Sequence, residues 1–155
     1  TVGIGAVKYA DLSTERTKDY VFDWERMLSF DGNTAPYLQY AYARICSIFS
    51  KWEGERASLT SAELILTHPE ELALARRLAD FPSAMDESIS TFSPHKLCTH
   101  LHSIASSFAS FYENCNVLKG EGTEVIRSRL AMCDLTAREL KLGLGLMGIG
   151  VPERM

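Results

Sequence analysis

Hydrophobic and polar residues alternate along this chain with the spacing of amphipathic helices. In the last third of the chain, apolar residues recur every three or four positions, at 126, 130, 133, 137, 140, 144 and 147, which gathers them on one helix face. A second broad apolar face begins at Leu97 and extends to Tyr112. The sequence contains no convincing alternation with a period of two and no internal repeat. The pattern therefore predicts an all-α fold, built as a helical bundle.

Polar breaks and helix-capping residues divide the chain into these helices. Asp23, either Asn33 or Thr34, and Thr123 are side chains suited to cap a helix, and a turn is expected at residues 120–122. Prolines fall where a first helical turn tolerates them. We expect helices over residues 4–12, 24–30, 34–52, 68–81, 83–92, 94–114 and from 123 to about 147.

The helix expected over residues 34–52 has two distinct faces. One stripe of apolar residues forms its core face: Leu38, Tyr42, Ile45, Phe49 and Trp52. Tyr37, Tyr40 and Arg44 lie on another arc, displaced by about 120°. Phenol rings could stack on unpaired nucleobases while the guanidinium binds a phosphate or a base edge. Alternatively, the tyrosines pack on a neighbouring helix and Arg44 is a surface charge; the spacing alone favours this second interpretation.

Length and composition indicate one soluble domain with its own core. The chain has 155 residues, of which 46% are hydrophobic and 23% charged. No apolar run approaches the roughly 18 to 20 residues of a bilayer span, and no basic leader is present. The missing initiator methionine and an opening within a helical pattern lead us to expect a piece of a longer protein. The four cysteines lie far apart, which favours free thiols in a reducing cytosol.

The charge balance argues against nucleic-acid binding. The net charge is −4 and the isoelectric point is near 5.6, whereas domains that bind nucleic acid usually carry excess Lys and Arg. The acidity is concentrated in residues 61–122, which hold 4 basic and 8 acidic side chains. A nucleic-acid face would therefore have to be built from the two ends of the chain.

A long motif in residues 30–44 resembles a known family. These residues read FDGNTAPYLQYAYAR, which is similar to the signature of arginyl-tRNA synthetases. Residues 2–12 resemble the segment that follows the second class I signature in those enzymes and joins the catalytic domain to the anticodon domain. Residues 111–115 and 146–155 are similar to the late helices and carboxyl terminus of the family. The resemblance covers nearly the whole chain.

The resemblance implies a helical bundle of the class I synthetase anticodon-binding type, known as DALR. Residues 1–22 would be a connector that follows the catalytic domain, and residues 23–155 the anticodon-binding domain. Tyr37 and Tyr40 would contact or stack on nucleotides of the tRNA(Arg) anticodon loop, and Arg44 would hold backbone or base edges. Asn33 would help to place that surface, and the chain's last residue would reach back to the loop. The expected tRNA-binding residues are Asn33, Tyr37, Tyr40, Arg44, Tyr112 and Met155.

The same resemblance assigns catalysis to another part of the parent protein. The HIGH-type and KMSKS-type motifs that position ATP are absent from this sequence. The parent would be a cytoplasmic, ATP-dependent arginine–tRNA ligase that uses Mg, whereas this chain would be inactive alone and would hold no cofactor or metal. Its partners would be tRNA(Arg) and the catalytic domain of the same polypeptide, with neither a membrane nor DNA involved. Binding by this chain alone should be weak, because many phosphate contacts of the parent lie elsewhere.

Several other interpretations of the sequence have less support. A helical protein–protein interaction domain is the main alternative, and the acidic net charge favours it. His95, Cys98 and His102 share one helix and Cys115 follows at its end, but no paired C-x-x-C supports a zinc site. A cysteine nucleophile lacks support because the sequence supplies neither an oxyanion hole nor a strand-turn-helix elbow. Glycines in residues 143–148 resemble G-x-G-x-x-G, yet they end a helix, where they favour close packing. Four basic residues could form a path for tRNA phosphates or a salt-bridged surface: Arg127, Arg129, Arg138 and Lys141. The oligomeric state stays open.

Overall fold

A computed structural model of the chain describes residues 1–19, 21–119 and 122–155. Within those residues the structure is helical and has no strand, which confirms the predicted all-α fold. The elements are α1 (Val2–Ser13), α2 (Trp24–Leu28), α3 (Ala35–Phe49), the 3-10 helix η1 (Arg56–Ser61), α4 (Pro69–Ala79), α5 (Phe81–Ser90), α6 (Pro94–Asn114) and α7 (Thr123–Leu146). None of these helices is long and apolar enough to cross a membrane.

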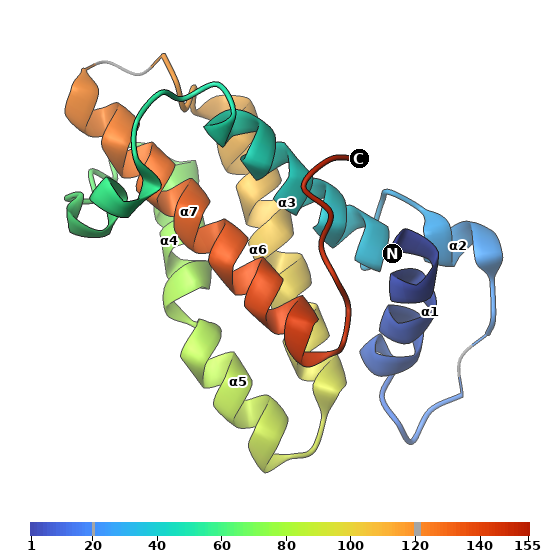
Figure 1. Cartoon of the computed structure of the whole chain (residues 1–155). Coiled ribbons are helices and arrows are strands. Elements are labelled where there is room, and N and C mark those ends of the chain that lie inside the picture. The colour runs from blue at the N-terminus through green and yellow to red at the C-terminus, as the bar shows by residue number, and fades with distance from the viewer. Residues whose placement is uncertain (20, 120–121) are drawn as a thin grey trace.

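The long helix α6 is the centre of the bundle. It contacts α1, α3, α4, α5 and α7, and α7 runs beside it across the front of the molecule (Figure 1). The predicted apolar face of α6 is buried: Leu101, Ile104 and Phe111 have no exposed surface. Gly143 on α7 faces Leu101, and a Cβ at this position would lie 2.6 Å from Leu101 Cδ2. The expected role of this glycine in close helix packing is therefore confirmed.

Local sequence signals set most helix starts. Asp23 accepts a hydrogen bond from the amide of Arg26, and Thr34 Oγ1 accepts one from the amide of Tyr37, so both predicted caps are confirmed. Thr123, expected as a cap, is instead the first residue of α7. The residue before it is Gly122, whose φ of 101° lies in the left-handed region that glycine adopts without strain. Residues 120 and 121 of the expected turn lie outside the described residues.

Several predicted helix bounds differ from the structure by one to three residues, and two of these differences involve a proline or an aromatic side chain. The break expected at Phe81–Pro82 falls at Asp80, because Pro82 fits the first turn of α5 as well as it would end α4. The third helix ends at Phe49, short of Trp52, whose ring packs edge-on against Phe49 at 5.9 Å between centroids. The four cysteines are free, as predicted.

A buried ion pair ties α4 to α7. Glu71 has no exposed surface, and its Oε1 accepts a hydrogen bond from Arg129 Nε at 2.6 Å. Glu71 Oε2 accepts the backbone amides of Thr67 and His68 at 2.9 Å each. Burial raises the pKa of Glu71, but the hydrogen bonds from these amides and from Arg129 outweigh it and hold the pKa below its ordinary value. The carboxylate is therefore charged and fully paired in the folded protein.

Candidate nucleic-acid interface

Helix α3 presents Tyr40 and Arg44 on successive turns of one face. The Arg44 guanidinium carbon lies 4.8 Å from the centre of the Tyr40 ring and 4.9 Å from the centre of the Tyr112 ring. Arg44 Nη2 also donates a hydrogen bond to the Tyr40 hydroxyl at 2.7 Å. Tyr112 comes from the last turn of α6. The two helices together hold a guanidinium against two aromatic rings, which restricts its motion before any ligand arrives.

The carboxyl-terminal tail is bound along α3 and forms the opposite side of this site. Gly148, with φ 66°, turns the chain after α7, and Ile149 is buried. Lys8 Nζ donates to the Gly148 carbonyl at 2.8 Å, and Gln39 Nε2 donates to the Gly150 carbonyl at 2.7 Å. Figure 1 shows the tail crossing in front of α3. These contacts bring the end of the chain beside Tyr40.

The tail and the tyrosine–arginine stack enclose a groove of about 680 Å³. We call it the tail groove; its lining residues are Tyr40, Ala43, Arg44, Cys46, Ser47, Ser50, Tyr112, Glu153, Arg154 and Met155. Tyr40, Tyr112 and Met155 are 40%, 38% and 47% exposed, so their apolar surfaces are available to a ligand. Four of the six residues expected to bind tRNA thus meet here. The two arginines of the groove, Arg44 and Arg154, both lie outside the acidic segment of residues 61–122.

Tyr37 does not line the tail groove. Its side chain is half-buried against the core, and its ring centre lies 5.5 Å from that of His102 on α6. Tyr37 and Arg44 occupy nearly the same angle around α3, but they stand two turns apart along its axis. Helix α6 covers the first of these turns. A helical wheel alone could not distinguish Tyr37 from Arg44, because it shows the angle of a residue around the helix axis and not its position along that axis.

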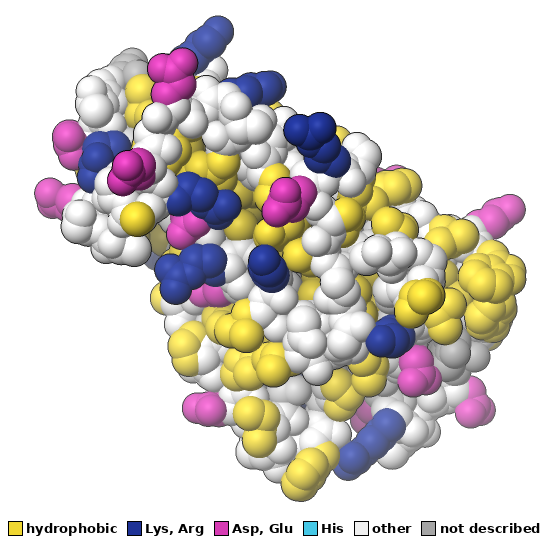
Figure 2. Space-filling view, in the orientation of Figure 1, with side chains coloured by type: hydrophobic (Ala, Val, Ile, Leu, Met, Phe, Trp, Pro, Cys, Tyr) yellow, Lys and Arg dark blue, Asp and Glu magenta, His cyan; other side chains and the backbone are white. Residues whose placement is uncertain are grey.

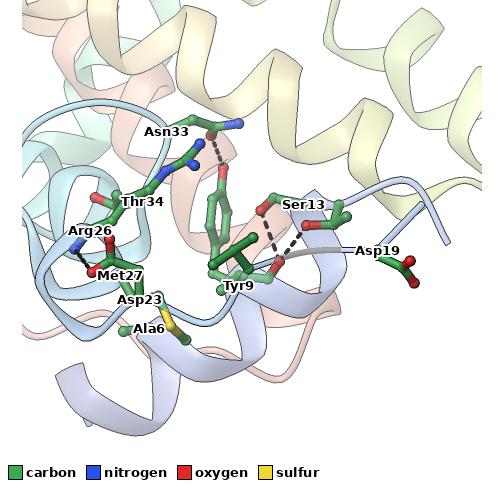
Figure 3. Close-up of a pocket in the computed structure, with 12 residues that line it drawn as sticks. Ala6, Tyr9, Ser13, Asp19, Asp23, Arg26, Met27, Asn33 and Thr34 are labelled. Carbon is green, nitrogen blue, oxygen red and sulfur yellow. Dashed lines mark hydrogen bonds between the residues drawn. The ribbon is translucent and has the colours of Figure 1, made fainter.

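Asn33 lies at a second cavity, of about 380 Å³, beside α1 and α2 (Figure 3). Its Oδ1 accepts a hydrogen bond of 2.7 Å from the Tyr9 hydroxyl, which Figure 3 shows as a dashed line. The same hydroxyl lies 2.9 Å from the carbonyl oxygen of Cys98. Asn33 therefore links the segment before α3 to α1, and it does not line the tail groove.

Gln39 is a positioning residue that no pattern in the sequence indicated. It is fully buried and carries the contact that fixes the tail at Gly150, 111 positions away. No local pattern signals a contact over such a distance. The only sequence signal was the presence of a glutamine among apolar residues on the inner side of a helix, because a buried amide requires a hydrogen-bonding partner.

The other sites considered from the sequence do not assemble. Burial raises the pKa of the Cys98 thiol to about 12, and its Sγ lies 3.3 Å from Met147 Sδ. No group of three or more His, Cys, Asp or Glu residues suited to a metal ion occurs in the described part of the chain. Two of the basic residues of α7 are engaged internally: Arg127 donates to the Ser58 carbonyl and Arg129 binds Glu71. They form part of the fold and not an open phosphate path.

Comparison with known families gives the groove its context. A family model described as the DALR anticodon binding domain matches residues 38–155, which is more than half of the chain. The chain belongs to this family. A model described as the catalytic domain of class I (R) tRNA synthetases matches residues 1–24 of the same DALR chain. These matches favour the nucleic-acid interpretation over a general protein-interaction domain.

Individual relatives and solved structures agree with the family match. Arginine–tRNA ligase of Citrobacter koseri is 50% identical over 154 residues, covering 99% of this chain. Arginyl-tRNA synthetase from Plasmodium falciparum superimposes on 99% of the chain with a TM-score of 0.89 and 35% identity. The Thermus thermophilus arginyl-tRNA synthetase superimposes on 99% of the chain with a TM-score of 0.86 and 34% identity. The DALR chain spans about 27% of the length of these proteins.

Proposed function

We propose that this DALR domain binds the anticodon loop of tRNA(Arg) as part of an arginine–tRNA ligase. The observation that carries the proposal is the guanidinium of Arg44, held between two exposed tyrosines at the edge of the tail groove. Each component suits single-stranded RNA. Aromatic rings stack on unpaired bases. A guanidinium binds phosphates, and in a single strand it also reaches the base edges that pairing would hide.

We assign different roles to the six candidate residues. Tyr40 and Tyr112 offer ring surface to bases, Arg44 binds a phosphate or a base edge, and Met155 covers the bound nucleotide with an apolar side chain. Two residues act from outside the groove. Tyr37 supports α3 from the core side, and Asn33 orients the segment before α3 through its bond to Tyr9.

The remainder of the parent protein would supply the chemistry. Residues 1–22 would connect the catalytic domain to residues 23–155, a division that the match of residues 1–24 to a catalytic-domain model supports. The catalytic domain would bind ATP with Mg and join arginine to the tRNA. This chain would contribute affinity and selectivity for tRNA(Arg), and we expect the parent to work in the cytoplasm.

The test is titration of an RNA hairpin that carries the anticodon loop of tRNA(Arg), at low salt. Tyr40→Ala should weaken binding by about 5-fold to 150-fold, because stacking on one aromatic ring is worth roughly 1 to 3 kcal/mol per base. Tyr40→Phe keeps the ring and should retain most of the affinity. Ile89→Ala serves as the matched control, because Ile89 is an exposed apolar residue on α5, which does not contribute to the groove.

Two results would count against the proposal. Equal affinity of Tyr40→Ala and Ile89→Ala would show that the ring does not contact RNA. Binding that is insensitive to added salt would also contradict it, because phosphate contacts release counterions and make RNA affinity strongly salt-dependent.

A further inference from the structure

A third cavity, of about 490 Å³, adjoins the tail groove on the other side of Arg44. Arg44, Ser47 and Tyr112 line both cavities, so the stacked guanidinium and the Tyr112 ring form a shared wall. This third cavity extends away from the tail toward the connection between α6 and α7. We call it the connection pocket; its other lining residues are Ile48, Lys51, Glu113, Asn114, Cys115, Asn116, Val117, Leu118 and Lys119.

The floor of the connection pocket is held in place by the fold. Cys115 and Val117 are buried, and the amide of Lys119 donates to Asn116 Oδ1 at 3.0 Å. Arg129, the partner of buried Glu71, also donates to the Asn116 carbonyl at 2.9 Å. This stretch of the connection is therefore fixed to the core through α7, and a ligand that enters the pocket meets a preformed surface.

The two cavities together are basic, although the whole chain is acidic. Arg44, Lys51, Lys119 and Arg154 line them, against the acidic side chains of Glu113 and Glu153, while the chain carries a net charge of −4. Lys51 and Lys119 are both exposed. Figure 2 shows Lys and Arg side chains in a row along the upper edge of the molecule, over α3 and beside the carboxyl-terminal tail. Positive charge is thus concentrated where the two cavities meet.

We propose that the connection pocket is a second RNA compartment, which holds the nucleotide next to the one bound at Tyr40. Lys51 and Lys119 bind its phosphates, and Arg44 in the shared wall contacts the phosphate that joins the two nucleotides. This inference rests on the proposed function, because it extends the same strand beyond the tail groove. The polar lining and the two flexible ammonium groups suit a phosphate backbone better than an apolar protein surface.

The number of phosphates contacted can be measured from the salt dependence of binding. In a log–log plot of affinity against salt, each phosphate contact on a single strand contributes a slope of about −0.7. The double variant Lys51→Ala with Lys119→Ala should therefore reduce the slope of binding to the anticodon-loop hairpin by about 1.4. We expect its affinity at low salt to fall about 10-fold or more.

A control variant that removes the same charge distinguishes the loss of phosphate contacts from a change in the net charge of the protein. Arg76→Ala with Arg77→Ala removes the same two charges from exposed positions on α4, which does not line either cavity. This variant should leave the slope unchanged and the affinity at about 0.15 M salt within about 2-fold, since exposed charges more than about 8 Å apart are then largely screened. Circular dichroism and urea unfolding should show that both double variants keep the fold.

Tyr40→Ala, measured in parallel, distinguishes the possible failures. If Tyr40→Ala weakens binding while the lysine variant behaves like the Arg76 and Arg77 control, the second compartment is wrong and the tail groove stands. If the unsubstituted chain does not bind the hairpin, or if neither variant has an effect, both proposals are overturned. If the lysine variant lowers the slope while Tyr40→Ala has no effect, Lys51 and Lys119 contact phosphates, but the nucleotide at Tyr40 and with it the two-compartment arrangement are overturned.

Discussion

Two arginines of this domain, Arg129 and Arg44, use the same guanidinium group in opposite ways. Arg129 is mostly buried, and the protein itself supplies its acceptors: the Glu71 carboxylate and the Asn116 carbonyl. Arg44 is half-exposed between two phenol rings, and the hydrogen bond that the structure gives it goes to the Tyr40 hydroxyl. No carboxylate pairs with it among the described residues.

The difference between Arg129 and Arg44 shows how to distinguish an arginine that stabilises the fold from an arginine that binds a ligand. A guanidinium has five N–H donors in a fixed plane, and a folded protein must satisfy those that it buries. Arg129 has its donors directed at protein acceptors, so its removal should affect the fold. Arg44 keeps donors facing a groove, so its removal should affect a ligand and leave the fold intact. Substitutions of Arg129 and of Arg44 test the two halves of this difference separately.

The largest effect is expected from Arg129→Leu. This change leaves the Glu71 carboxylate buried with no cation, which should lower the free energy of unfolding by about 3 to 5 kcal/mol. Urea unfolding at neutral pH would measure the loss. The double variant Glu71→Gln with Arg129→Leu is the matched control, and it should lose less than Arg129→Leu alone because no unpaired charge remains. Equal losses in the two variants would mean that the pair acts only through packing.

The pH dependence of the same pair has a definite sign. Because the pKa of Glu71 lies below its ordinary value in the folded protein, the unfolded chain binds the proton more readily. The contribution of the pair to stability is therefore present at neutral pH and is lost as the pH falls below about 4.5. In Arg129→Leu the trend should reverse, since protonation would relieve the unpaired carboxylate. Unfolding curves between pH 3 and 7 would show the reversal.

The same contrast explains which parts of the fold could be predicted. Apolar spacing identified α6 and α7, because each buries a continuous stripe against several neighbours. Capping chemistry located the starts of α2 and α3. The sequence left Arg129 either on a path for tRNA phosphates or on a salt-bridged surface, and it could not identify the buried partner Glu71, which lies 58 positions away. Sequence spacing identifies the face of a helix, but it does not identify the partner that faces it.

The candidate site was predictable only in part, for the same reason. Tyr40 and Arg44 are one helical turn apart, so their juxtaposition follows from α3 alone. The addition of Tyr112 and Met155 came from the family resemblance, since no local rule joins α3 to the end of the chain. Gln39 was missed because its contact with Gly150 depends on the path of the tail. The connection pocket was missed because its two lysines come from different elements.

Glu139 sharpens the comparison, because it is a buried carboxyl that forms no salt bridge among the described residues. Its Oε2 has no hydrogen-bonding partner among the described residues, and burial raises its pKa from 4.5 to about 7. The folded protein therefore binds this proton more tightly than the unfolded chain does, so stability should fall as the pH rises from 4.5 to 7. Glu139→Gln should remove this fall and raise the free energy of unfolding at pH 8 by about 1 to 3 kcal/mol. Urea unfolding at pH 5 and pH 8 measures the difference, and equal pH profiles for the variant and parent would contradict it.

The smallest and most selective effect is expected from Arg44→Lys. Lysine keeps the positive charge but cannot lie as a flat group between the Tyr40 and Tyr112 rings or fork onto two acceptors. Binding of the anticodon-loop hairpin should weaken by about 5-fold, roughly 1 kcal/mol, with the salt slope unchanged because the charge remains. Arg44→Gln should lower both the affinity and the slope. Stability should change by no more than about 0.5 kcal/mol in either variant, as expected for a partly exposed side chain. A loss of stability as large as that of Arg129→Leu would show that Arg44, too, belongs to the fold.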